Sequence, residues 1–122
     1  MPCPLTVGVY AMGRDEFEGE VARVLEDLPR DLRGRIANVA FGVEDGLERM
    51  NLLGLYEGVP LTRRTTQYAF VLPDRITIYR YPILVRCRTY DEVVERIGIV
   101  VKHEIGHYFG LSDARLHELG YA

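Results

Sequence analysis

The spacing of apolar and polar residues along the chain predicts a domain that mixes helices with a few strands. Residues 14–28 carry apolar side chains at helical spacing, and Pro29 then ends this predicted helix. A buried strand is predicted over residues 36–43, between glycine-rich and polar flanks that mark turns. Residues 46–66 mix glycine and proline with large apolar residues, which predicts an ordered loop. Its GLYEG stretch is interpreted as a structural turn, with a cleft wall as the alternative.

Two runs rich in β-forming residues follow this loop. They are separated by Pro73 and Asp74, a pair that suits a hairpin-like turn. The second run, residues 76–81, alternates between isoleucine or arginine and threonine or tyrosine. Because Pro82 cannot donate a hydrogen bond to a neighbouring strand, the pattern predicts an edge strand.

A capping box opens the last long helix. The side chain of Thr89 is placed to accept a hydrogen bond from the backbone of Glu92, three residues further on. Apolar residues then recur at helical spacing over positions 93–101 and lead directly into two histidines, and Gly110 closes the helix. A short final helix is predicted over residues 113–119. The complete pattern is that of an α+β domain.

Length, composition and charge narrow the range of functions. A chain of 122 residues with 48% hydrophobic residues can bury its own core, so we expect one domain over residues 1–122. The net charge of -3 is small and of the wrong sign for a phosphate-binding surface, so no nucleic-acid partner is expected. No run approaches the ~18 apolar residues of a membrane helix and no basic leader is present, so we expect a cytoplasmic protein without a membrane partner. Cys3 and Cys87 are interpreted as reduced thiols. The pattern does not specify an oligomeric state.

The stretch HEIGHYFGLSD, residues 103–113, carries the candidate chemistry. On a helix, residues four apart lie on one face with Cβ atoms about 5–6 Å apart, so the imidazoles of His103 and His107 can bind one ion. Zinc accepts imidazole nitrogen and prefers four ligands, so this pair supplies half of a zinc site. Glu104 is rotated by about 100° from His103. Its carboxylate can therefore lie beside the metal as a general base for bound water rather than as a ligand.

A third protein ligand has to come from beyond Gly110. Glycine readily takes the left-handed conformation that ends a helix and reverses the chain. Asp113 and His117 are the next side chains that can return to the metal, and the short loop after Gly110 favours Asp113. Asp113 has a competing role as the N-cap of the final helix. His117 remains the alternative ligand, or a residue that orients a ligand.

The motif has a recognisable relative. The spacing His103-Glu104-x-x-His107-x-x-Gly110-x-x-Asp113 resembles the zincin-like metallopeptidases, and its closing aspartate is similar to that of the snapalysins. Together with the stretches LLGLYEGVPLTRR and LPDRITIYR, it resembles a small bacterial family of minimal zincins. The resemblance implies a zincin-like fold with a short mixed sheet beside the active-site helix. It also implies zinc bound by His103, His107 and Asp113, with Glu104 as the base. The related metzincins end their motif in a third histidine followed by a methionine turn, so their specificity is not carried over.

The expected function is zinc-dependent hydrolysis of a peptide or protein substrate. We expect the predicted edge strand at residues 76–81 to hold an extended peptide by strand addition. Tyr79, Tyr81 and Tyr108 each carry a phenol that can stabilise a developing oxyanion, although packing is the commoner role of such tyrosines. The alternative is a non-catalytic protein in which zinc holds the last helix or the cleft binds a peptide without cleaving it. Glu104 argues against this alternative, because a structural zinc site needs no free carboxylate beside the metal.

Overall fold

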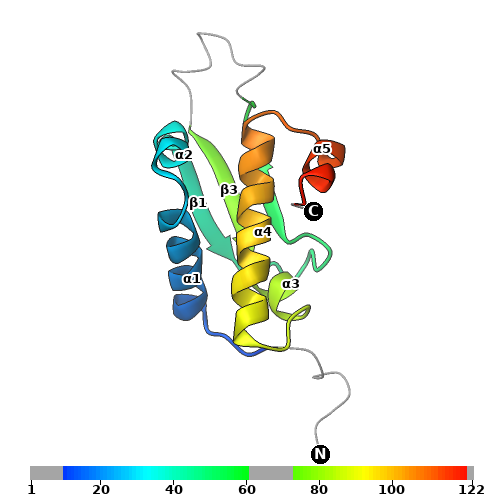
Figure 1. The fold of residues 1–122 in the computed structure, drawn as a ribbon. Coiled ribbons are helices and arrows are strands. Elements are labelled where there is room, and N and C mark those ends of the chain that lie inside the picture. The colour runs from blue at the N-terminus through cyan, green and yellow to red at the C-terminus, as the bar shows by residue number, and fades with distance from the viewer. Residues whose placement is uncertain (1–9, 61–72, 121–122) are drawn as a thin grey trace, which may run out of the picture.

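The computed structural model describes residues 10–60 and 73–120 (Figure 1). Along these ranges the chain forms five helices and three strands. Their bounds are α1 Arg14–Glu26, α2 Arg30–Arg35, β1 Val39–Glu44, β2 Gly54–Glu57, β3 Asp74–Tyr79, α3 Arg80–Leu84, α4 Tyr90–Tyr108 and α5 Asp113–Glu118. The α+β class and the long helix that carries the histidines are confirmed. No helix within these ranges is both long enough and apolar enough to cross a membrane.

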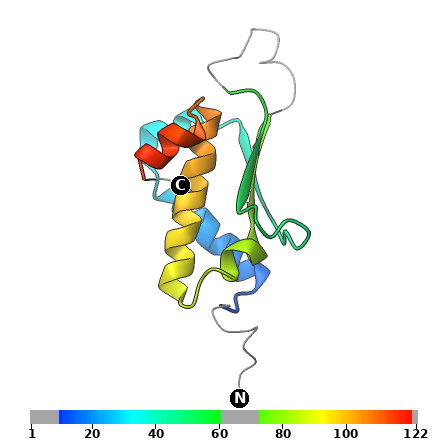
Figure 2. The same ribbon diagram turned by 90° about the vertical axis from the view of Figure 1, so that its right-hand side faces the viewer.

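The three strands form a mixed sheet in the order β1-β3-β2. β1 pairs with β3 in parallel, with Val43 opposite Ile78. β2 pairs with β3 antiparallel, with Tyr56 opposite Ile76. Helices α1 and α4 pack against each other on one face of this sheet (Figure 2). The sheet and the helical layer therefore form two layers, with the long helix α4 running across the sheet.

The prediction of an edge strand at residues 76–81 is wrong, because β3 is the central strand. Ile76 and Ile78 are completely buried, and Thr77 on the opposite face of the strand is buried as well. The methyl group of threonine and the ring of Tyr79 are apolar enough to be buried on that other face. Residues 80–81 begin α3 instead, and Pro82 lies in the first turn of that helix, where its missing N–H has no helical acceptor.

Other boundaries also differ from the sequence pattern. Helix α1 ends before Pro29, as predicted. The strand predicted over residues 36–43 begins only at Val39, because residues 30–35 form α2 and Ile36 still donates to the carbonyl of Leu32. The predicted loop contains β2, whose pairing with β3 no local pattern indicated. The run at residues 68–72, and with it the predicted hairpin, lies outside the described residues.

The core lies between α1, α4 and the sheet. Completely buried side chains include Phe17 of α1 and three residues of α4: Val93, Ile97 and Val101. These three are spaced four residues apart, so they form one stripe along the helix. Burying a large aliphatic side chain contributes about 1.5–3 kcal/mol relative to leaving it exposed. The stripe therefore fixes the rotation of α4 about its axis, and with it the direction of the histidines further along.

The N-terminus of α4 is capped as the sequence predicts. The hydroxyl of Thr89 accepts a hydrogen bond of 3.1 Å from the N–H of Glu92. The Glu92 carboxylate accepts from the N–H of Arg88 at 2.9 Å, one residue before the position expected for a capping box. Two backbone donors at this end of the helix are thus satisfied locally.

Thr89→Ala should lower the free energy of unfolding by about 1 kcal/mol, because the N–H of Glu92 loses its side-chain acceptor. Urea unfolding followed by circular dichroism measures the change. Thr89→Ser is the control, because it keeps the hydroxyl and should retain most of the stability. Equal stability of Thr89→Ala and the wild type would contradict the role of the cap.

Candidate metal centre

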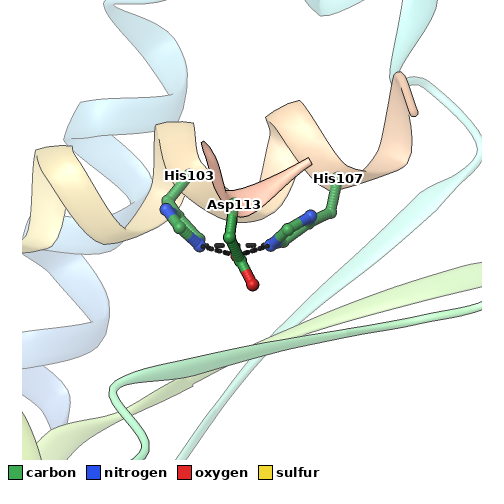
Figure 3. Close-up of side chains that lie close together, drawn as sticks. All are labelled: His103, His107 and Asp113. Atoms are coloured by element: carbon green, nitrogen blue, oxygen red, sulfur yellow. Dashed lines mark hydrogen bonds and ion pairs between the residues drawn. The ribbon is translucent and has the colours of Figure 1, made fainter. Parts of the chain in front are cut away.

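His103 and His107 lie one turn apart on α4, and their rings converge. Their Nε2 atoms are 3.1 Å apart. Both side chains are about a quarter exposed, at 22% and 27%. The two rings point from either side toward the carboxylate of Asp113 (Figure 3). The two Nε2 atoms are therefore close enough to bind a single ion, as the helical spacing predicts.

A tight turn after α4 brings Asp113 to these nitrogens. Gly110 has a φ of 88°, a conformation that L side chains rarely adopt. Its N–H donates to the carbonyl of His107, and the N–H of Leu111 donates to the carbonyl of Gly106. These two bonds form the Schellman motif that ends many helices. The prediction that Gly110 closes the helix and reverses the chain is confirmed.

The start of α5 leaves the Asp113 carboxylate available to the histidines. The N-cap is Ser112, whose hydroxyl accepts from the N–H of Arg115 at 3.2 Å. The competing role proposed for Asp113 is therefore filled by its neighbour. Asp113 Oδ1 lies 3.0 Å from His107 Nε2 and 3.4 Å from His103 Nε2.

The three atoms have the spacing expected around a zinc ion. With bonds of about 2.0–2.1 Å, two ligand atoms of a tetrahedral zinc lie roughly 3.3 Å apart. The observed separations of 3.0, 3.1 and 3.4 Å lie around this value. Two imidazole nitrogens and one carboxylate oxygen are also a donor set that zinc accepts, with a fourth position left for water or substrate. Within the described part of the chain, His103, His107 and Asp113 form the group that could hold a metal ion.

The other ring nitrogen of His107 is fixed by the same turn. Nδ1 lies 3.0 Å from the carbonyl oxygen of Leu111. Because a carbonyl can only accept, Nδ1 carries the proton and Nε2 presents its lone pair. The turn at Gly110 therefore positions both an incoming carboxylate and a carbonyl that orients one of the histidines.

Glu104 lies beside this group and is only 7% exposed. Its carboxylate accepts a hydrogen bond from the backbone N–H of Tyr56 in β2. Burial raises the pKa of the Glu104 carboxyl above its ordinary value. The neighbouring histidines and the Tyr56 N–H oppose this shift, whereas the charge of Asp113 adds to it. The carboxylate is thus held in a partly desolvated position next to three potential metal ligands.

A glycine in β2 allows this close approach. A Cβ atom on Gly54 would lie 2.7 Å from Cγ1 of Val100 and 3.1 Å from Cγ of Glu104. Neither distance leaves room for a methyl group, so a side chain at Gly54 would displace α4 at the position of Glu104. Gly54 was not among the residues predicted to shape the site. A glycine between apolar residues in a strand was the available signal, because it often marks the close approach of another segment.

A cavity of about 580 Å³ opens over the candidate metal centre. One side is formed by α4 and the turn after it, and the other by β2 and its flanks, with Leu52, Gly54, Leu55, Tyr56 and Pro60 in the lining. A second cavity of about 210 Å³ lies beside α4 and shares His103 and Glu104 with the first, and most of its lining is apolar. The first four residues of GLYEG form β2, and three of them line the cavity. The interpretation of this stretch as a structural turn is therefore wrong, and the alternative of a cleft wall agrees with the structure.

The tyrosines singled out from the sequence do not line either cavity. Tyr79 and Tyr81 lie near the end of β3 and in α3, and the hydroxyl of Tyr108 donates to a backbone carbonyl of the segment before β1. Tyr56 lines the larger cavity, but its hydroxyl donates to the buried carboxylate of Asp74. The structure therefore gives none of the three predicted phenols a position at the metal centre.

The zincin-like metallopeptidase family matches residues 36–121 of the chain. This span contains the whole sheet, the helix α4 and the candidate metal centre. The chain belongs to this family, which confirms the resemblance inferred from the motif. No curated protein matches the chain.

The geometry separates the two candidates for the third ligand. Asp113→Ala should weaken zinc binding by more than the roughly 10–100-fold that an orienting neighbour costs, because it removes a ligand atom. His117 is exposed on α5 and outside the group of three, so His117→Ala should weaken binding less than tenfold. Competition with a chelator of known affinity measures both. The opposite ranking would transfer the assignment to His117.

Proposed function

We propose that this protein is a zinc-dependent peptidase in which Glu104 is the general base. The proposal rests on the buried carboxylate of Glu104. It lies next to three atoms with the spacing of zinc ligands but is not one of them. A structural zinc site closes all four positions with protein and needs no such neighbour. Membership of a metallopeptidase family supports the same assignment.

His103 and His107 would hold the ion with their Nε2 atoms and Asp113 with Oδ1. When bound, zinc lowers the pKa of a coordinated water to about 7 and polarises a carbonyl group. The bond from His107 Nδ1 to the carbonyl of Leu111 keeps this imidazole in the tautomer that binds metal.

In this proposal Glu104 transfers a proton twice. Its carboxylate first accepts the proton of the attacking water and then gives it to the amine that leaves. The Tyr56 N–H holds the carboxylate, and the absence of a side chain at Gly54 lets α4 carry it close to β2. A base held in this way needs little reorganisation during the reaction, which is a main source of catalytic rate.

The peptide would lie along β2 rather than along β3. β3 has a strand on each side, so it has no edge for strand addition. β2 lines the cavity opposite the metal centre. The N–H of Tyr79 in β3 donates to the carbonyl of Leu53. In an antiparallel pair, residues that bond to the partner strand alternate with residues whose N–H and C=O point away from it. Leu53 bonds to β3, so the backbone groups of Gly54 and Tyr56 point to the outer edge of β2. The N–H of Tyr56 donates to Glu104 on that side.

The two cavities share Leu52, Gly54, His103 and Glu104 in their lining, and together they give the substrate a direction. An extended peptide passing the metal centre along α4 would have its reacting carbonyl near Glu104 and a neighbouring side chain in the smaller cavity. Leu52, Leu53, Ile99 and Val100 line that cavity. We therefore propose an extended, unstructured peptide with an apolar residue next to the cleaved bond as the substrate.

Glu104→Gln tests catalysis separately from metal binding. The amide cannot accept the proton of the water, and losing a general base typically costs roughly 10²–10⁴-fold in rate. Zinc content should stay at one per chain, because Glu104 is not a ligand. Both proteins are incubated with a mixed peptide library at matched zinc occupancy, and products are identified by mass spectrometry.

Glu95→Gln is the matched control. Glu95 is an exposed glutamate on the same helix, so its substitution should leave both zinc content and cleavage unchanged. Equal cleavage by Glu104→Gln and the wild type would point to another base or to a contaminating protease. Zinc binding without cleavage by the wild type, across the whole library, would favour a non-catalytic zinc protein.

A further inference from the structure

Helix α4 contains a glycine where an alanine would form a better helix. Glycine in a helix interior loses more backbone entropy on folding than any other residue. Gly98 and Gly106 are the two glycines of α4. A Cβ added at Gly98 would have no atom within 4 Å, whereas a Cβ at Gly106 would meet the side chain of Leu116. A packing requirement therefore exists at Gly106 and not at Gly98.

The contact between Gly106 and Leu116 is too close for any side chain. A Cβ on Gly106 would lie 2.3 Å from Cδ2 of Leu116 and 3.3 Å from both Cδ1 and Cγ. Leu116 is 1% exposed and is the buried residue of α5. Because Gly106 has no side chain, α4 has a notch at this position. Leu116, the apolar residue that anchors α5, fills this notch.

This anchor bears on the position of Asp113. Helix α5 has six residues, too few to be stable by itself, so its position depends on what it packs against. Asp113 lies three residues before Leu116, on the same side of the helix. Its own side chain is 84% exposed, so little packing around the carboxylate can hold it near the histidines.

We propose that Gly106 is a positioning residue for the third metal ligand. By accepting Leu116, it lets α5 dock closely enough for Asp113 Oδ1 to reach the Nε2 atoms of His103 and His107. This inference rests on the proposed metal centre and adds a residue that touches neither the metal nor a substrate.

A methyl group at Gly106 leaves the chain two responses. Leu116 can turn its end away from the notch, or α5 can move away from α4. Either response removes the anchor from its site and frees the start of α5. The His103 and His107 side chains remain on α4, so the expected defect is the specific loss of the aspartate ligand.

The first experiment measures zinc affinity of Gly106→Ala and Gly106→Val by chelator competition. Zinc binding should weaken by roughly 10–100-fold, as for other changes that disturb the orientation of a ligand. The absorption spectrum of the cobalt-substituted protein should change at the same time, because one ligand is lost or replaced by water. Gly98→Ala is the matched control on the same helix and should keep wild-type zinc affinity and raise the melting temperature.

A double-mutant cycle with Asp113→Asn separates positioning from general destabilisation. In the Asp113→Asn background there is no carboxylate to position, so Gly106→Ala should have no further effect on zinc affinity. Leu116→Ala removes the other partner of the same contact. It should also weaken zinc binding on its own and have no further effect in the Asp113→Asn background. An equal loss in both backgrounds would overturn the proposal, because Gly106 would then act through the histidines.

The failure of this inference differs from the failure of the proposed function. Wild-type zinc affinity in both Gly106 variants, with one zinc bound per wild-type chain, would overturn the role of Gly106 and leave the metal centre intact. A wild type that binds no zinc would overturn the metal centre and the role of Gly106 together. If Gly106→Val does not fold, the alanine variant and Leu116→Ala decide the question.

Discussion

The packing of α4 against the sheet is the constraint on which the rest of the structure depends. Val93, Ile97 and Val101 fix the rotation of the helix by burial. At about 100° per residue, Glu104 falls within the arc of this buried stripe, and the two histidines lie to one side of it. Glu104 is therefore buried beside β2, while His103 and His107 line the cavity. A rotation of α4 that exposed Glu104 would also expose part of the core.

The polar atoms of the site have a spacing that suits a cation. Two Nε2 atoms 3.1 Å apart cannot both present lone pairs without repulsion unless a proton or a metal ion lies between them. Adding two carboxylates, Asp113 and Glu104, increases the local negative charge. A divalent ion would interact favourably with His103, His107 and Asp113 at once, with Glu104 beside it. Because the histidines and Asp113 come from different helices, binding the ion should also favour the docked position of α5.

The parts of the protein that were predicted correctly depend on residues close together in sequence. Thr89 and Glu92 form the cap of α4, and the spacing of His103 and His107 follows from helical geometry. Gly110 could be assigned to the helix end because its conformation is a local property of the residue. Whether Asp113 caps α5 was decided only by the structure, in which Ser112 is the N-cap. Its role as a metal ligand is still a prediction.

The helix that carries the motif and the turn that follows it could both be predicted from the sequence, as could the residues of the candidate metal centre. These features are encoded within stretches of a few residues. Three features became visible only in the folded chain: β3 is the central strand, β2 lines the cavity, and Gly54 and Gly106 lie at close contacts between elements. Each of these depends on a pairing or packing partner contributed by another element, and the free energy of such contacts is absent from any local pattern.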